Sequence, residues 1–341
     1  MICQDRPRVR FVHLPTPLEA APLLSEALGV DLLIKREDLA GLCVGGNKAR
    51  LLEFAIGALR EEGVDTLIAC AAEQSNKLRD IAAVAARSGM KAVLLIPGDP
   101  PTPGGAARQG NRLLFDILGA EVRLIPPGLD RGAIIAAQEA VRDACAAAGR
   151  RAAILDRALG YGIDATIAYV DAAEELHRQL AGAAAPHAVF IAAGAGMTAA
   201  GLALGLKHLA SPMRVMGVCI AGRAAELAPE IERHAARAAE ALGISTRLCA
   251  EDLTLIDDYA AIGYGVVTPP LVDVIRRFAR LHGMVVDPVY NAKVALALVD
   301  GIAAGRIPRG ASVVYVNTGG SPAIYDYAET LAGGRQSEKV E

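Results

Sequence analysis

Residues 187–205, HAVFIAAGAGMTAAGLALG, carry the pattern that decides the fold. The stretch begins with an apolar, strand-forming run, continues through Gly194 and Gly196, and ends in a segment rich in Ala and Leu. A strand that passes through a glycine loop into a helix is the unit from which parallel α/β sheets are built. Because such a loop leaves backbone amides free at the start of the helix, it can also hold a phosphate group.

The same alternation extends through most of the chain, which favours sheets of parallel strands covered by helices. The expected strands are 64–72, 91–97, 121–126, 187–193, 213–220 and 312–317. The expected helices are 48–62, 76–88, 131–148, 198–209 and 270–282. Glycines that can adopt a left-handed cap follow four of these helices, at Gly63, Gly89, Gly149 and Gly283. The Pro/Gly-rich stretch 98–105 predicts a surface loop, either a lid or a plain connection, and 333–341 predicts a frayed tail.

Composition narrows the possible functions. With 341 residues, 53% of them hydrophobic and 21% charged, the chain can form one or two large cores. A net charge of -3 provides no basic field for nucleic acid. The six cysteines are scattered without metal-ligand spacing, so we expect reduced thiols and no metal. The start lacks an apolar signal core and no run is long enough to span a membrane, so we expect a cytoplasmic protein.

Two further segments place a reactive side chain where a ligand could reach it. VGGNKAR (44–50) puts Lys48 in the first turn of a helix, after two glycines that allow close approach of a ligand. A lysine is poorly placed there against the helix dipole, although surface lysines do occur at helix starts. AAEQSNKLRD (71–80) puts Ser75 and Asn76 at the start of the next helix, where they can cap it or help its amides receive a carboxylate.

The C-terminal third contributes GYG (263–265), DPVYNAK (287–293) and VYVNTGG (314–320). Thr318 follows the carboxyl end of an expected strand, where parallel sheets bind ligands. Tyr264 and Tyr290 are candidates for a site because the chain has only eight tyrosines and no tryptophan, but either could also be a packing residue. The glycine spacing near Gly194 departs from the GxGxxG fingerprint, and no acidic residue ends the next strand, so a nicotinamide enzyme is the less favoured interpretation.

In this order and spacing, the segments resemble the family of 1-aminocyclopropane-1-carboxylate deaminase and D-cysteine desulfhydrase. The match extends from LPTPLEAAPLLSEALGVDLLIKREDLAGLCVGGNKAR to NTGGSPAIYDY and covers most of the chain. It implies the α/β, two-domain, tryptophan-synthase-β-like fold of type II pyridoxal-phosphate enzymes, with open, mostly parallel twisted sheets covered by helices. A larger domain (1–52 and 166–341) would bind the cofactor, a smaller one (53–165) would be inserted, and the active site would lie in the cleft between them. The resemblance also implies a homodimer.

The resemblance implies pyridoxal 5′-phosphate held as a Schiff base on Lys48, with the hydroxyl of Thr318 meeting the ring nitrogen. The candidate cofactor-binding residues are Lys48, Asn76, Gly194, Ala195, Gly196, Met197, Thr198 and Thr318. The candidate catalytic residues are Lys48, Ser75, Tyr264 and Tyr290. The candidate substrate-binding residues are Ser75, Asn76, Lys77, Tyr264, Tyr290 and Asn291.

Two positions separate the branches of this family. Deaminases carry Glu after the second tyrosine and Leu before the last glycine pair, whereas desulfhydrases carry small hydroxyl residues at both. This chain has Asn291, which fits neither branch, and Thr318, which favours the desulfhydrases. It also departs from the family at Leu51, where a phosphate-binding lysine is usual, at Lys77, where His or Gln is usual, and at 71–73, where glycines are usual.

We therefore expect α,β-elimination from D-cysteine or a related β-substituted amino acid, which gives pyruvate and ammonia. Lys48 would act as the base, and a tyrosine would move a proton near the leaving group. Ring opening of 1-aminocyclopropane-1-carboxylate is an alternative. Elimination from an acidic substrate such as cysteate is another, because Lys77 could pair with a sulfonate, hold the cofactor phosphate, or simply face solvent. From a different class, the chain could bind the cofactor or an amino acid without catalysis.

Overall fold

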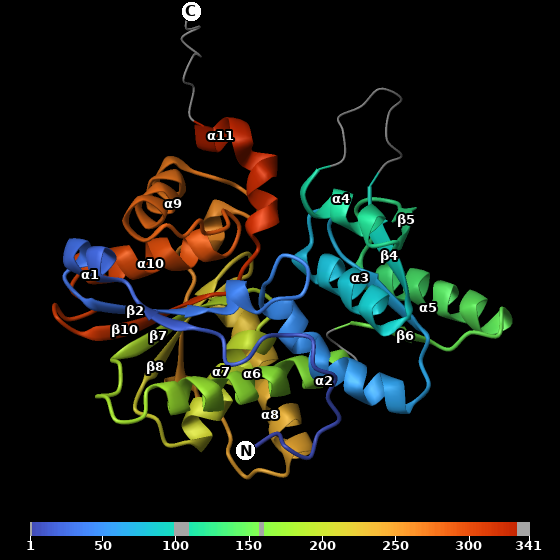
Figure 1. Ribbon diagram of the computed structural model, residues 1–341, viewed down its shortest axis with the longest axis horizontal. Coiled ribbons are helices and arrows are strands. Elements are labelled where there is room, and N and C mark those ends of the chain that lie inside the picture. The colour runs from blue at the N-terminus through green and yellow to red at the C-terminus, as the bar shows by residue number, and fades with distance from the viewer. Residues whose placement is uncertain (1, 99–108, 157–159, 333–341) are drawn as a thin grey trace, which may run out of the picture.

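Two sheets organise the chain in the computed structural model, which describes residues 2–98, 109–156 and 160–332 (Figure 1). The larger sheet has the order β1 (Leu18–Ala20), β2 (Asp31–Arg36), β10 (Ser312–Asn317), β7 (Ala188–Ala193), β8 (Arg214–Cys219) and β9 (Leu253–Ile256). The smaller sheet has the order β5 (Glu121–Ile125), β4 (Lys91–Pro97), β3 (Thr66–Cys70) and β6 (Ala152–Ile154). Among the described strands, β1 alone pairs antiparallel to its neighbour, β2, and all other pairings are parallel.

Helices cover both faces of the larger sheet (Figure 1). One face carries α1 (Pro22–Leu28), α9 (Pro269–His282) and α10 (Asn291–Ala303), and the other carries α6 (Gly160–Gln179), α7 (Met197–His208) and α8 (Ala224–Leu242). Along β7, Phe190 packs into the first layer and Ile191 into the second, because successive side chains of a strand face opposite sides. With both faces buried, β7 is an unbroken apolar run rather than an alternating one.

The remaining helices accompany the smaller sheet or join the two halves. They are α2 (Asn47–Glu61), α3 (Asn76–Ser88), α4 (Gly110–Ile117) and α5 (Arg131–Ala147), with α11 (Ala328–Ala332) near the C-terminus. Short 3-10 helices are η1 (Glu37–Leu39), η2 (Ala250–Asp252), η3 (Ala260–Ile262) and η4 (Ser321–Tyr327). In Figure 1, α2 runs from the larger sheet towards the smaller one. This arrangement confirms the predicted α/β class with two mostly parallel sheets covered by helices.

Two glycines let α7 pack unusually close to α6. A Cβ atom at Gly201 would lie 2.2 Å from the carbonyl oxygen of Thr166, and one at Gly205 would lie 2.5 Å from the Cβ of Ala173. Any side chain at Gly201 would therefore collide with backbone, which cannot move away as a flexible side chain could. The close packing fixes the direction of α7 and hence the position of the glycine loop that precedes it.

Element boundaries follow the sequence prediction within a few residues. The predicted helix 76–88 and strands 91–97 and 312–317 are observed with those limits, whereas the predicted strand 64–72 is shorter, Thr66–Cys70. The two residues after β3, like Cys70 at its end, form part of a cavity wall. The predicted domain limits at 52/53 and 165/166 fall inside α2 and α6, and the division into domains stays a prediction.

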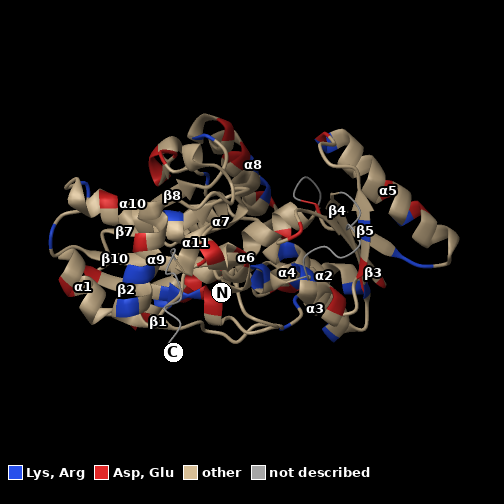
Figure 2. Ribbon diagram, turned by 90° about the horizontal axis from the view of Figure 1, so that it is seen from above, with Lys and Arg blue, Asp and Glu red and all other residues tan. Residues whose placement is uncertain are grey.

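Charges of both signs are interspersed over the ribbon rather than gathered by sign (Figure 2). In the described ranges, no helix is long and apolar enough to cross a membrane. The described residues also contain no cluster of three or more His, Cys, Asp or Glu side chains that could hold a metal ion. The predicted loop at 99–105 and the predicted tail at 333–341 lie outside the described residues.

Candidate active site

A cavity of about 650 Å³ opens at the carboxyl ends of strands from both sheets. Residues at or just after the ends of β7, β8 and β10 meet residues that end β3 and β4. This edge of a parallel sheet is where α/β folds bind ligands. Of the residues predicted from the sequence, those that line the cavity are Lys48, Ser75, Asn76, Lys77, Gly194, Ala195, Gly196, Met197, Thr198, Tyr264, Tyr290 and Thr318.

Lys48 is the second residue of α2, and it lines the cavity directly after a glycine turn. Gly45 and Gly46 have φ values of 75° and 114°, which side chains rarely allow. A Cβ atom at Gly45 would lie 1.9 Å from the carbonyl oxygen of Asp38, so the turn requires glycine. The Nζ atom of Lys48 donates a hydrogen bond to Oδ1 of Asn47 at 3.0 Å.

The environment of Lys48 favours its neutral form. Burial lowers the pKa of Lys48 to about 8, because the ammonium ion loses its water. The charge of Asp80 opposes this change, whereas Arg79 and Lys77 lower the pKa further. A lysine with such a pKa is partly a free amine near neutral pH, and it can then act as a nucleophile or a base.

Arg79 of α3 holds the glycine turn from the side of the smaller sheet. Its Nη2 donates to the carbonyl oxygen of Gly45 at 2.8 Å, and its Nε donates to Oδ1 of Asp80 at 3.0 Å. Both side chains are fully buried, and burial raises the pKa of Asp80. Oδ2 of Asp80 has no hydrogen-bond partner among the described residues. The pair thus fixes the turn before Lys48 and places a carboxyl group close enough to influence the amine.

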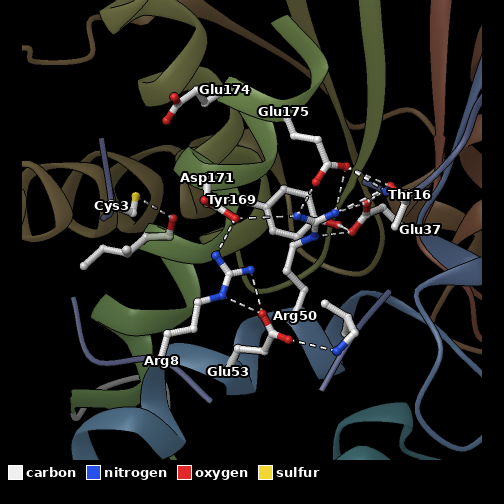
Figure 3. A network of polar contacts seen from close by, with 12 residues as sticks. Cys3, Arg8, Thr16, Glu37, Arg50, Glu53, Tyr169, Asp171, Glu174 and Glu175 are labelled. Atoms are coloured by element: carbon white, nitrogen blue, oxygen red, sulfur yellow. Dashed lines mark hydrogen bonds and ion pairs between the residues drawn. The ribbon is translucent and has the colours of Figure 1, made fainter. Parts of the chain in front are cut away.

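Arg50 faces the other side of α2, inside a buried network of ion pairs (Figure 3). Its Nε and Nη2 donate to the carboxylate of Glu37 at 2.8 and 2.7 Å, and its Nη1 and Nη2 donate to that of Glu175 at 3.2 Å. Lys35 of β2 also donates to Glu175. These contacts tie η1, α2 and α6 together, so the first turn of α2 is held from both sides.

The glycine loop presents the start of α7 to the cavity. Gly196 precedes the helix with φ 86°, and a Cβ atom there would lie 2.8 Å from Cγ1 of Ile231. No side chain in the described part of the chain caps this helix start. The amides of 197–199 have no intrahelical acceptor, as in any first turn, so they are available to an anion. Thr198 adds a hydroxyl, which accepts a hydrogen bond from Nδ2 of Asn47 at 3.5 Å.

Ser75 and Asn76 occupy the start of α3 on the opposite wall. The hydroxyl of Ser75 accepts a hydrogen bond from the amide of Leu78 at 3.3 Å, so it is the helix cap, and its own proton can still be donated. Oδ1 of Asn76 accepts from Nη1 of Arg79 at 2.9 Å and from Nδ2 of Asn111 at 2.8 Å. These two donors fix the amide of Asn76, and its NH₂ group stays available as a donor.

Lys77 lies in the same wall, one residue further along α3. Its Nζ donates to the carbonyl oxygen of Cys70 at the end of β3, at 3.2 Å. Leu51 is fully buried in the hydrophobic core and contributes no charge to the cavity. Leu51 thus brings no charge to the cavity, whereas Lys77 is one of the cationic side chains in its wall.

Tyr264 and Tyr290 form a pair at the mouth of the cavity. Their hydroxyl oxygens lie 2.9 Å apart, and their rings meet edge to face with centroids 5.9 Å apart. Tyr264 is 51% exposed, whereas Tyr290 is largely buried. Burial raises the pKa of both phenols, that of Tyr290 well above its usual value. Both therefore keep their protons near neutral pH and can donate them.

Thr318 lies just past the end of β10, and Asn291 lies behind it. Asn291 is fully buried and does not line the cavity, so the structure does not support its predicted contact with substrate. Its side chain is engaged instead by Asp287, by the carbonyl oxygen of Gly319 and by Thr318. The prediction rested on the family position after the second tyrosine, but the first residue of α10 points into the core instead of into the cavity.

Other cavity residues were not predicted from the sequence. Arg131 and Asp156 form an ion pair of 2.7 Å in the wall, and Tyr161 at the start of α6 is buried with no hydrogen-bond partner for its hydroxyl among the described residues. All three come from loops or helix starts next to the smaller sheet. Asn47 could have been found from its position beside Lys48. The other three carry no local pattern, because distant parts of the chain bring them to the site.

The cavity fits pyridoxal phosphate. Lys48 provides an amine of lowered pKa for covalent attachment. The uncapped start of α7 provides free amides and the positive end of a helix dipole for the phosphate group. Thr318, just past the end of the neighbouring strand β10, lines the cavity with a hydroxyl that would be available to the cofactor ring.

Comparisons with known proteins agree with this geometry. The family model described as "Pyridoxal-phosphate dependent enzyme" matches residues 9–319. A crystal structure of an ACC deaminase homologue is similar over 97% of this chain and 97% of that chain, with 29% identity and a TM-score of 0.86.

More distant structures share the fold alone. A threonine deaminase from T.th. has 24% identity and a TM-score of 0.59, over 89% of this chain and 92% of that chain. A hydrogen sulfide-producing enzyme from Fusobacterium nucleatum has 16% identity and a TM-score of 0.63, over 90% of this chain and 96% of that chain.

Proposed function

The chain belongs to the family of pyridoxal-phosphate dependent enzymes, with pyridoxal 5′-phosphate as its cofactor, and we propose that it eliminates the β-substituent of a small amino acid. D-Cysteine or a related β-substituted amino acid is the favoured substrate, and pyruvate and ammonia are the products. One observation carries the proposal: a single cavity holds Lys48, an amine of lowered pKa, together with the hydrogen-bonded pair Tyr264 and Tyr290. Elimination needs such a base and such a proton donor on one substrate.

Lys48 has two tasks in this proposal. The cofactor, when bound, supplies the electron sink for negative charge at the substrate Cα. Lys48 would hold the cofactor, and its free amine would remove the proton from Cα of the substrate. With a pKa of about 8, about a tenth of such amines are neutral at pH 7. Oδ1 of Asn47 keeps the amine within the cavity through its hydrogen bond.

Ser75 and Asn76 bind the substrate carboxylate. The hydroxyl proton of Ser75 and the NH₂ group of Asn76 are donors, and they stand at the positive end of the α3 dipole. The hydrogen bonds from Arg79 and Asn111 hold the side chain of Asn76 in one orientation, which directs its NH₂ group. Orientation of the carboxylate in turn aligns the Cα proton with Lys48.

Tyr264 and Tyr290 move a proton to the leaving group. Tyr290 is the more buried of the two, so it donates to the departing sulfur, and half-exposed Tyr264 replaces that proton from solvent through their hydrogen bond. For cysteine, the balance is one cysteine and one water consumed, with one pyruvate, one ammonia and one hydrogen sulfide released. Breaking the C–S bond requires no external oxidant or reductant.

Two other substrates are favoured by particular observations. The 29% identity with an ACC deaminase homologue over nearly the whole chain supports ring opening of 1-aminocyclopropane-1-carboxylate. The presence of Lys77 and Arg131 in the cavity wall supports an acidic substrate such as cysteate, although Asp156 balances the charge of Arg131.

We further propose that the chain forms a homodimer and that segments 1–52 and 166–341 form one domain around the inserted segment 53–165.

The test is release of keto acid by the cofactor-loaded protein from D-cysteine, L-cysteine, cysteate and 1-aminocyclopropane-1-carboxylate. Pyruvate and sulfide from D-cysteine are expected, and Lys48→Ala should abolish both. Lys91→Ala, which alters an exposed lysine, is the matched control and should leave both unchanged. 2-Oxobutyrate from the cyclopropane substrate alone would replace the proposed reaction. A protein that binds the cofactor but yields no keto acid from any substrate would be a binding protein instead.

A further inference from the structure

The first turn of α10 carries a fully buried lysine, Lys293, which the proposed mechanism does not use. Its Nζ donates two hydrogen bonds of 2.8 Å, to the carbonyl oxygens of Ile220 and Gly263. Burial lowers the pKa of Lys293, and no carboxylate of the described residues forms an ion pair with it. A buried basic group without a carboxylate partner is costly to the fold, which indicates that its two contacts serve a purpose besides stability.

The two carbonyl oxygens belong to segments that build the cavity. Ile220 directly follows β8 and lines the cavity, and its amide donates to the carbonyl oxygen of Ala193 at the end of β7, at 3.3 Å. The carbonyl of Gly263 is in the same peptide unit as the amide of Tyr264, the half-exposed phenol at the cavity mouth. Lys293 therefore joins α10 both to the carboxyl end of β8 and to the turn that carries Tyr264.

The turn around Tyr264 has little structure of its own. Residues 263–268 form neither helix nor strand, and Tyr264 lies between Gly263 and Gly265, which have φ values of 92° and 73°. Glycine leaves the backbone more conformational freedom than any other residue, so the local chain does not fix the phenol of Tyr264. A hydrogen bond to the peptide that precedes Tyr264 limits this freedom directly.

Tyr290, the partner of Tyr264, lies immediately before α10 and is thus placed by the same helix. We propose that Lys293 is a positioning residue for this tyrosine pair. By holding Gly263 to the first turn of α10, Lys293 keeps the phenol of Tyr264 within hydrogen-bond distance of its partner. The 2.9 Å between the two hydroxyl oxygens is the distance that this contact maintains. The catalytic use of the pair rests on the proposed function, whereas the contact itself can be tested without turnover.

The consequence falls on proton transfer rather than on substrate binding. A proton moves efficiently only between groups held at hydrogen-bond distance, and a displacement of about 1 Å can cost roughly 10²-fold in rate. Ser75 and Asn76, the proposed ligands of the substrate carboxylate, belong to the start of α3 and not to the segments that Lys293 joins. Loss of Lys293 should therefore lower kcat and leave KM close to its wild-type value.

The first experiment is carbon-13 NMR of the holoenzyme without substrate, with tyrosine labelled at Cζ. The signals of the pair are assigned with Tyr264→Phe and Tyr290→Phe. In the wild-type background, Tyr264→Phe should shift the Tyr290 signal, because it removes the hydrogen bond between the two phenols. In the Lys293→Met background, the same substitution should lose most of this effect. An undiminished effect there would overturn the proposal, and so would the absence of any effect in the wild-type background.

The second experiment is a double-mutant cycle on kcat, with the substrate that gives the most keto acid. Lys293→Met alone should lower kcat about 10- to 100-fold, with KM within about threefold of the wild-type value. In the Tyr264→Phe background it should lower kcat by less than about threefold, because the phenol that it positions is gone. Equal losses in both backgrounds would assign Lys293 to stability alone and overturn the proposal. If no substrate is turned over, the proposed function fails, and the NMR result still decides the role of Lys293.

Tyr259→Phe is the matched control. The hydroxyl of Tyr259 donates to Oδ2 of Asp300 at 2.6 Å, so this bond also joins the segment before Tyr264 to α10. Its loss should lower stability and leave both kcat and the response of the Tyr290 signal unchanged. If Lys293→Met does not fold, Lys293→Gln decides, since its amide nitrogen lies one bond closer to the backbone and cannot keep both contacts. A full response of the Tyr290 signal in that variant would contradict the proposal.

Discussion

Lys48 and Arg50 are two basic residues, two positions apart on α2, with opposite surroundings. Arg50 is fully buried, and the carboxylates of Glu37 and Glu175 accept hydrogen bonds from its guanidinium group. Lys48 faces a cavity, and in the described part of the chain its Nζ donates one hydrogen bond, to a neutral amide. Residues two apart on a helix point to nearly opposite sides, so one helix presents both environments.

The difference indicates that Arg50 stabilises the fold, whereas Lys48 is suited to a chemical reaction. Arg50 lies between two acidic residues, which strengthens its charged state and fixes α2. No carboxylate of the described residues forms an ion pair with Lys48, and burial lowers the pKa of its amine to about 8. A buried charge that the fold leaves poorly compensated is a mark of a functional residue. Replacing each residue by methionine, which is of similar length, tests the distinction.

The largest effect is expected for the activity of Lys48→Met. This substitution removes both the point of cofactor attachment and the proposed base, so kcat/KM should fall by at least roughly 10³-fold. Keto-acid release in a coupled assay would measure the loss. Activity within about tenfold of the wild type would mean that another group performs the proton transfer.

The second largest effect is expected for the stability of Arg50→Met. It leaves Glu37 and Glu175 buried without their shared partner, which should lower the free energy of unfolding by about 3–5 kcal/mol. Urea unfolding followed by circular dichroism would measure it. Arg50→Lys keeps the charge but not the forked geometry, so it should fall between the wild type and the methionine variant. Equal stability of all three proteins would contradict the role given to Arg50.

A smaller effect is expected for the stability of Lys48→Met without cofactor. Its free energy of unfolding should rise, whereas that of Arg50→Met should fall. The pKa of Lys48 is about 8 in the folded protein and 10.5 in the reference state, so the folded protein disfavours the ammonium form. The variant should therefore gain on the order of 1 kcal/mol below pH 8. That gain in stability should decline as the pH rises from 8 to 10.5. Over this range Lys48 of the folded wild type is already neutral, so burying it costs progressively less. A loss of stability at pH 7 would show that Lys48 is structural.

The smallest effect is expected for Lys77→Gln. Lys77 lines the cavity, and its Nζ donates to the carbonyl oxygen of Cys70 at 3.2 Å, so its charge should raise affinity for acidic substrates by at most about fivefold. KM for cysteate should rise and KM for D-cysteine should not. Loss of cofactor on dialysis would instead assign Lys77 to the phosphate group, and the exposed lysine in Lys91→Gln provides the control.

The sequence sufficed for features that depend on local pattern. The strand 187–193, the glycine loop and the helix after it share one continuous apolar and glycine pattern, and Lys48 is marked by the two glycines before it. The alternation of such units predicted the parallel sheets. The family resemblance contributed the cofactor and most cavity residues, which local pattern alone would have left as isolated candidates.

Contacts between residues that lie far apart in the sequence could not be predicted from local pattern. Glu175 lies 125 positions from Arg50, and nothing near either residue indicates that the two meet. Three cavity residues come from segments next to the smaller sheet: Tyr161, Arg131 and Asp156. They reach the site because both sheets contribute residues to the wall of the cavity. Asn291 was assigned to the substrate from a family position, whereas its buried side chain contacts Asp287, Gly319 and Thr318.

The order of strands also constrains synthesis. β2 pairs with β10, which the ribosome makes about 280 residues later, so the centre of the larger sheet cannot close until nearly the whole chain has emerged. The smaller sheet uses only residues 66–154 and can form while the rest is still being made. Because the cavity needs Thr318 at the end of β10, the nascent chain acquires its binding site as one of its last steps. A chain stalled before residue 312 would carry Lys48 but no pocket for the cofactor.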